Sequence, residues 1–226
     1  MKISKNTLDL LKNFSGINTS ILVKPGNEIC TVNNAKTIVA FATVPEDFTV
    51  QFGIYDLNNF ISTVNLFEEP NVEFDTNSMT ITGGVSQCSY GYAEESVIAS
   101  PKKRVTFPGS DVDFDLPKDT FDRVMKASST LALPMLAVTK DAKNNIVLRA
   151  IDPKNPNANA FSVIVGQDLS EKRYNFLIQT ELLKMVRGDY KVSISSKFLC
   201  RFAATDIEYF VAVEKSSEFS DPTPKP

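Results

Sequence analysis

Basic residues recur at helical spacing in three separate segments of the chain. Within a segment they stand three or seven positions apart, so they fall on one side of a helix, opposite its apolar residues. They are Lys5 and Lys12, Arg123 and Lys126, and Lys184 and Arg187. Such cations meet phosphates without reading bases, which predicts weak, salt-sensitive contact with nucleic acid of any sequence. Ordinary solvated helix faces carry the same residues, so the spacing alone leaves both interpretations open.

The sequence lacks the residues on which most enzymatic sites depend. It has no histidine, which removes the commonest general base and the commonest metal ligand. Gly83-Gly84 is not followed by the Lys-Ser or Lys-Thr of a phosphate-binding loop. We therefore expect no enzymatic activity, no metal and no cofactor. An acid–base pair built from carboxylates distant in the sequence is the one arrangement that this inventory leaves open.

Composition predicts a soluble, cytosolic chain. The net charge is −3, and residues 1–113 hold eight basic and 13 acidic residues, so the acidity lies in the first half. Any contact with nucleic acid must therefore come from a local basic face. No apolar run approaches the roughly 18 residues that a membrane span needs. The three cysteines are too scattered for a disulfide framework, and we expect buried free thiols.

The sequence repeats itself at a spacing of 113 residues, half of its length of 226. The segment KNTLD at 5–9 returns as KDTFD at 118–122, and each copy runs into an apolar strand, a polar turn and a second strand. A second similarity follows in each half. Residues 52–54 lead into a helical pattern at 57–66, and residues 176–178 lead into a corresponding pattern at 182–187. The repeat predicts two like units that offer similar faces to their neighbours.

The periodicity predicts an α+β fold in which each half is β-rich with two short helices. The helices are expected at 5–14, 57–66, 118–128 and 182–187, with Ser4 and Asp56 at the starts of the first two. Strands are expected at 20–24, 28–32, 37–43, 48–54, 72–74 and 79–82. We expect an N-terminal domain at 1–100, a connector at 101–113, a C-terminal domain at 114–216 and a flexible tail at 217–226.

The segments MKISK at 1–5, LLKNF at 10–14 and IYDLN at 54–58 resemble the DNA polymerase sliding clamps of T-even-type bacteriophages. More distantly, the pattern is similar to clamps of the proliferating-cell nuclear antigen type. The resemblance implies the DNA clamp fold: a homotrimeric ring with two β-α-β-β-β units per chain. Antiparallel sheets would form the outside, and four short helices per chain would face duplex DNA.

The resemblance also implies a function without chemistry of its own. Such a clamp, a processivity factor, is opened and closed by an ATP-dependent clamp loader, tethers the replicative DNA polymerase, and serves as a mobile activator of late transcription. The protein would act in the cytoplasm of the infected bacterial host. The six cations named above match the helix positions that face DNA in the family. The uncharged helix at 57–66 departs from clamps that carry lysines there.

Partner peptides of the family bind a hydrophobic pocket beneath the connector. By resemblance, that pocket would use residues of the connector, of one strand in the first half and of the C-terminal strand: Val105, Phe107, Ile38, Phe210 and Val213. A core role explains the last three equally well. For the joints between subunits we expect edge strands, with 79–82 of one copy pairing with 161–165 of the next.

Two alternatives belong to other classes. A duplicated β-rich structural or adaptor protein, such as a virion component, would share the repeat and the missing active site. A catalytically idle enzyme relative would also lack an active site, but no motif points to one. Ring closure separates the first alternative from a clamp, because an adaptor can be a monomer or a dimer.

Overall fold

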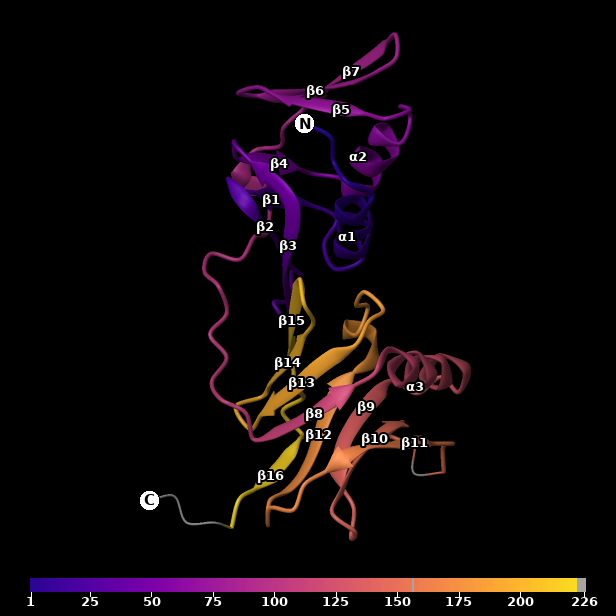
Figure 1. The fold of residues 1–226 in the computed structure, drawn as a ribbon. Helices are drawn as coiled ribbons and strands as arrows, with labels where there is room; N and C mark the ends of the chain where they lie inside the picture. The colour runs from indigo at the N-terminus through magenta and orange to yellow at the C-terminus, as the bar shows by residue number, and fades with distance from the viewer. Residues whose placement is uncertain (156, 223–226) are drawn as a thin grey trace. The chain divides into compact units, whose positions relative to one another are not determined.

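The computed structural model describes residues 1–155 and 157–222, and the chain divides into two compact units (Figure 1). The first unit holds residues 1–104 together with 206–208. The second holds residues 105–205 and the chain from Tyr209 onward. The units therefore differ from the expected domains in two places: the first runs on to Arg104, and it includes three residues from the second half.

The first unit carries two helices beside short antiparallel strands. Its elements are α1 (Lys5–Ser15), β1 (Ile21–Val23), β2 (Gly26–Val32), β3 (Ile38–Phe48), β4 (Phe52–Ile54), α2 (Leu57–Val64), β5 (Asn71–Phe74), β6 (Ser78–Gly83), β7 (Ser86–Gly91) and the 3-10 turn η1 (Glu95–Val97). β1 pairs with β4, β2 with β3, and β6 with both β5 and β7. α1 packs near β3, and Phe14, Leu57 and Phe60 are fully buried.

The second unit carries one helix and two antiparallel sheets. Its elements are β8 (Val112–Leu116), α3 (Lys118–Thr130), β9 (Met135–Lys140), β10 (Asn145–Ile151), β11 (Phe161–Gln167), β12 (Arg173–Gln179), the 3-10 turn η2 (Thr180–Leu182), β13 (Tyr190–Ser195), β14 (Leu199–Ala203), β15 (Ile207–Ala212), whose first two residues belong to the first unit, and β16 (Glu218–Ser220). One sheet has the order β11-β10-β9-β12-β16, and β8, β13 and β14 are neighbours in the other. α3 packs near β10 and β11, with Phe121 and Val124 buried.

The repeat seen in the sequence is a repeat of elements. α1 corresponds to α3, and the four strands that follow each helix correspond in order. In the first unit β1 pairs with β4, with Ile21 opposite Ile54. In the second unit the corresponding strands β9 and β12 pair in the same way, with Leu136 opposite Ile178. The units also differ: α2 has the short turn η2 as its counterpart, and β9 pairs with β10 whereas β1 and β2 lie in different sheets.

The predicted edge strand at 79–82 is wrong, because β6 lies in the middle of its sheet. Its backbone pairs with β5 on one side and β7 on the other. Periodicity marks these residues as a strand but does not give their place in the pairing order. β7 is an edge of that sheet, and β11, which contains the predicted segment 161–165, is an edge of the five-stranded sheet.

The predicted flexible tail is also wrong at its start. β16 pairs with β12, with Phe219 opposite Tyr174, and the ring of Phe219 stacks on Phe176 at a centroid distance of 5.9 Å. A single aromatic residue therefore anchors a stretch that composition alone marks as polar and rich in proline. Residues 223–226 of the predicted tail lie outside the described residues.

The cysteines are free, but only Cys200 is fully buried. Cys30 and Cys88 are half-buried, which corrects the expectation that all three lie in the core. No helix in the described ranges is long and apolar enough to cross a membrane.

Candidate nucleic-acid interface

α1 presents two of the predicted cations on an exposed face. Lys5 and Lys12 are exposed, whereas Leu11 and Phe14 on the other side are buried. Lys12 Nζ donates to Asn58 Oδ1 of α2 at 3.2 Å. Lys12 also stands in the last turn of the helix, where the carbonyl end of the helix dipole favours a cation. The two helices of this unit thus share one polar face.

α2 adds neutral polar groups to that face. Asn58, Asn59 and Ser62 are exposed, while Leu57 and Phe60 are buried. Asp56 accepts a hydrogen bond from the Asn59 N–H at 3.0 Å, which confirms the predicted helix start. Amides and hydroxyls can donate hydrogen bonds to phosphate oxygens without adding charge.

A buried carboxylate fixes the start of α1. Glu46 of β3, 7% exposed, accepts hydrogen bonds from the Ser4 N–H and from the Thr7 hydroxyl. Burial raises the pKa of Glu46, but the hydrogen bonds from Thr7 and Ser4 outweigh it and hold the pKa below its ordinary value of 4.5. Sequence spacing cannot reveal this contact, because the partners are about forty residues apart.

Replacing Glu46 with Ala should lower the free energy of unfolding by about 2–4 kcal/mol at neutral pH, since Thr7 and Ser4 would lose a charged acceptor. Because the folded pKa is lowered, the carboxylate contributes stability above its unfolded pKa and loses it as pH falls through the folded value. Urea denaturation at pH 7 and pH 4 measures both effects. Asp47→Ala, which removes the exposed neighbouring carboxylate, is the control. Equal losses from the two variants would contradict the role of Glu46.

α3 places its cations on the side away from the core. Arg123 and Lys126 are exposed, and Lys118, which the spacing argument did not select, is exposed on the same helix. The Lys118 N–H donates to Asp189 Oδ1 at 2.7 Å. A carboxylate distant in sequence therefore caps this helix, because the preceding residue is Pro117 and makes no side-chain cap.

The predicted fourth helix at 182–187 is wrong. Only Thr180–Leu182 form a 3-10 turn, and beyond it burial alternates as in extended backbone, with Leu183 and Met185 buried and Lys184 exposed between them. The segment is too short to nucleate a helix by itself. Two tyrosine hydroxyls instead form hydrogen bonds with the backbone of Val186. Its N–H donates to Tyr209 Oη at 3.1 Å, and its carbonyl accepts from Tyr190 Oη at 2.5 Å.

Arg187 nevertheless joins α3 through its side chain. Arg187 Nε lies 3.3 Å from Asp122 Oδ1, and its guanidinium lies over the Phe121 ring at 5.0 Å from the centroid. Lys118 Nζ contacts the other oxygen of Asp122 at 3.2 Å. We call Lys118, Asp122, Arg123, Lys126 and Arg187 the α3 face. Lys184, the other cation predicted in this segment, is also exposed.

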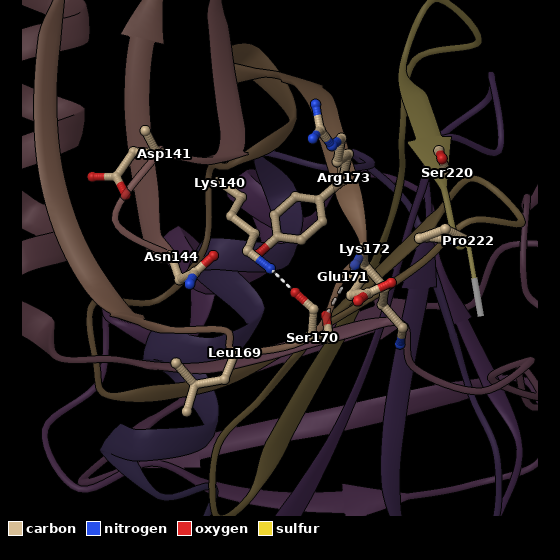
Figure 2. Close-up of a pocket in the computed structure, with 12 residues that line it drawn as sticks. Lys140, Asp141, Asn144, Leu169, Ser170, Glu171, Lys172, Arg173, Ser220 and Pro222 are labelled. Carbon is tan, nitrogen blue, oxygen red and sulfur yellow. Dashed lines mark hydrogen bonds between the residues drawn. The ribbon is translucent and has the colours of Figure 1, made fainter.

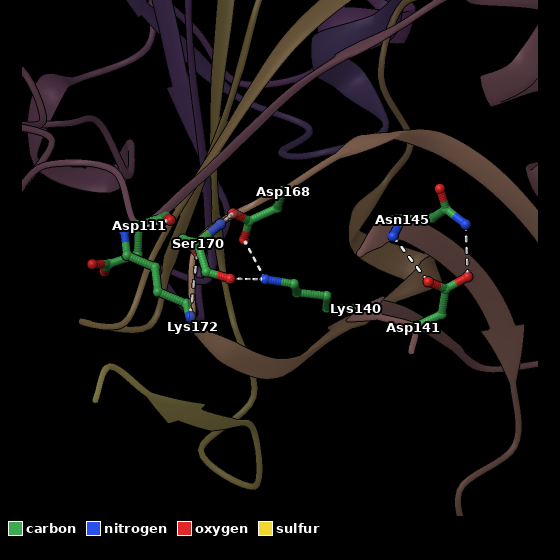
Figure 3. Close-up of polar contacts among 7 residues, drawn as sticks. All are labelled: Asp111, Lys140, Asp141, Asn145, Asp168, Ser170 and Lys172. Carbon is green, nitrogen blue, oxygen red and sulfur yellow. Dashed lines mark hydrogen bonds and ion pairs between the residues drawn. The ribbon is translucent and has the colours of Figure 1, made fainter. Parts of the chain in front are cut away.

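A polar hollow of about 940 Å³ lies elsewhere in the second unit, between the β9–β10 turn, the loop before β12 and the end of β16 (Figure 2). Its lysines are already engaged in internal contacts. Lys140 Nζ donates to the Ser170 carbonyl and lies 3.8 Å from Asp168 Oδ2, and Lys172 Nζ donates to the Asp111 carbonyl at 3.0 Å (Figure 3).

The surroundings of Asp168 favour the charged form of its carboxylate. Burial raises the pKa of Asp168, but hydrogen bonds from Ser170 and the charge of Lys140 more than offset this, and the pKa lies below its ordinary value. These contacts fasten the loop at 168–172 to its surroundings and give the hollow a structural role. Among the described residues no group of three or more Cys, Asp or Glu side chains is placed to hold a metal ion.

Comparison with known proteins shows the family to which the chain belongs. A family model described as DNA polymerase processivity factor matches residues 3–100, and one described as gp45 sliding clamp, C terminal, matches residues 113–215. The sliding clamp of Vibrio phage KVP40 is 33% identical over 219 residues, which cover 95% of this chain and 99% of that protein. This chain belongs to the sliding-clamp family. The clamp of Escherichia phage RB69 is 27% identical over 96% of this chain and 98% of its own length.

Solved structures of other clamps have a similar fold. This chain matches the proliferating cellular nuclear antigen of Entamoeba histolytica with a TM-score of 0.67 and 11% identity, covering 92% of this chain and 94% of that one. It matches the DNA polymerase III subunit beta of Borrelia burgdorferi with a TM-score of 0.71 and 12% identity, covering 99% of this chain and 67% of that one. The expected α+β DNA clamp fold is thereby confirmed, with three α-helices in the described ranges rather than four.

The residues expected to form a partner-peptide pocket in this clamp differ in exposure. Ile38 is 3% exposed in the first unit, and Phe210 and Val213 are 3% and 4% exposed in the second, so all three side chains are core residues of their units. Val105 and Phe107 of the connector are half-buried. The peptide pocket therefore stays a prediction, and only its connector residues have accessible side chains here.

Proposed function

We propose that this clamp closes as a homotrimeric ring around duplex DNA and tethers the replicative DNA polymerase without catalysing a reaction itself. The observation that carries the proposal is that, among the described residues, each unit leaves a sheet edge unpaired, β7 in the first and β11 in the second. Such edges invite pairing with another chain. β7 of one copy and β11 of the next would form a head-to-tail joint, which closes into a ring when the rotation permits.

The number of copies is taken from the family resemblance, which implies a ring of six units. The two units of this chain are compatible with such a ring built from three copies. Side chains support the choice of β11 as a joint: Ile164 on this strand is 59% exposed, a large apolar residue on a free edge.

The exposed cations suit a sequence-independent contact with DNA. The α1 and α3 faces present ammonium and guanidinium groups, which bind phosphates and carry no base-reading geometry. The acidic remainder of the chain disfavours DNA elsewhere on the surface, so the ring can slide instead of adhering.

Family membership supports the remaining partners as part of the proposal. We propose that an ATP-dependent clamp loader opens the ring and that a C-terminal peptide of the polymerase binds near the connector. The PCNA of A. fulgidus was solved with the C-terminal region of FEN-1 bound. It matches this chain with 12% identity and a TM-score of 0.69, covering 96% of this chain and 98% of that one. A role in late transcription, in the cytoplasm of an infected bacterium, belongs to the same proposal.

A topological test separates a ring from a surface binder. Clamp loaded by an ATP-dependent loader onto nicked circular DNA should stay bound during gel filtration, and cutting the circle once should release it from the free ends. Intact circles incubated with the restriction buffer are the control. Equal retention on cut and uncut DNA would contradict encirclement, because a surface contact does not depend on DNA ends.

A further inference from the structure

We infer that Asp122 is a positioning residue of the DNA-binding surface: its carboxylate holds Arg187 on the α3 face, where no fourth helix does so. The inference rests on the proposed function, in which this face meets DNA. An acidic side chain among cations that bind phosphate is unexpected on charge alone, since it repels the ligand.

The contacts of Asp122 are divided between two cations from different parts of the chain. Oδ2 lies 3.2 Å from Lys118 Nζ, one helical turn earlier, and Oδ1 lies 3.3 Å from Arg187 Nε. The side chain of Asp122 is 37% exposed and that of Arg187 is 47% exposed. The carboxylate therefore stands at the surface and joins α3 to the segment that follows η2.

The side chain of Arg187 depends on such an anchor because Arg187 does not lie on a helix that would direct this side chain to the α3 face. It follows an extended stretch that is fixed at Val186 by the hydroxyls of Tyr190 and Tyr209, and it precedes Gly188. Its guanidinium forms the ion pair through Nε and lies over the face of Phe121. Within the described part of the chain its terminal nitrogens have no hydrogen-bond partner, so they remain available to a phosphate.

Charge and position predict opposite results for Asp122→Asn. If Asp122 acts only as a negative charge, removing it should tighten binding to DNA and leave the salt dependence at least as steep. If Asp122 positions Arg187, the variant should bind more weakly, because a mobile guanidinium loses more side-chain entropy when it meets a phosphate.

The test is fluorescence anisotropy of the full-length clamp with a labelled duplex at low ionic strength and over a salt series. We expect Asp122→Asn to weaken binding about threefold or more and to reduce the slope of log K against log salt by up to about 1, the value for one phosphate contact. Asp119→Asn removes an equal charge from an exposed residue of the same helix and should not weaken binding. Asp122→Glu, which keeps the carboxylate, should restore most of the affinity.

The decisive comparison is a double-mutant cycle with Arg187→Gln. In that background Asp122→Asn should no longer weaken binding, since no guanidinium remains to be positioned. If Arg187→Gln weakens binding but Asp122→Asn behaves like Asp119→Asn, the positioning role of Asp122 is overturned, whereas the proposal that the α3 face meets DNA is supported. If neither Arg187→Gln nor Lys126→Gln changes the affinity, the α3 face does not meet DNA, and this part of the proposed function fails together with the inference. Unchanged thermal unfolding and native mass show that each variant is folded.

Discussion

Reversing four cations of the second unit should weaken binding to duplex DNA by a factor of about 100 while leaving the chain folded and its native mass unchanged. The substitutions change the predicted DNA-facing residues of this unit to Glu: Arg123, Lys126, Lys184 and Arg187. All four side chains are exposed, so the core does not change. A pair of unit charges at 4 Å in water is worth about 1 kcal/mol, and loss of most of four such attractions approaches the 2.7 kcal/mol that corresponds to about 100-fold.

The matched control reverses four other exposed lysines of the same unit, which lie outside the helix faces: Lys143, Lys154, Lys191 and Lys197. This variant has the same net charge as the first. If binding depends on the basic faces, the control should lose much less affinity, measured by anisotropy at one fixed salt concentration. Equal losses in the two variants would mean that net charge, and not these faces, governs the contact.

A charge on the edge of β11 should open the ring. Ile164→Lys replaces a 59% exposed apolar side chain on that edge, and lysine is a residue that natural proteins place on edges to prevent pairing. Loss of a buried isoleucine is worth about 1.5–3 kcal/mol, so we expect each joint to weaken at least about tenfold. Sedimentation velocity across a concentration series measures the change.

Leu169→Lys provides the comparison for this experiment. Leu169 is 81% exposed and lies just beyond the end of β11, so its replacement changes charge and surface hydrophobicity in the same way without altering the strand edge. Its association should match that of the unmodified chain. A joint that uses other strands would leave the Ile164 variant unchanged too.

The sequence predicted the three α-helices because each has an apolar stripe wide enough to face a sheet. The buried residues Phe14, Phe60 and Phe121 stand on those stripes as expected. The failed helix at 182–187 has a similar pattern of leucine and valine. There the outcome depends on hydroxyl groups from Tyr190 and Tyr209, which satisfy the backbone of Val186 from outside the segment.

Contacts between residues that are distant in the sequence could not be predicted either. Glu46 at the start of α1, Asp189 at the start of α3 and Asp122 beside Arg187 all act across tens of residues or between separate elements. Their own neighbourhoods in the sequence give no sign of these partners. Lys118 was the exception, since its spacing of four from Asp122 is a helical pair that could have been selected.

The native mass in solution tests the central claim most directly, because every proposed role depends on ring closure. Light scattering across a dilution series should give a species of about three times the 25.0 kDa chain mass, falling at most to separated chains at the lowest concentrations. A monomer or dimer at every concentration, including those at which the chain binds DNA, would contradict a trimeric ring and favour a duplicated adaptor.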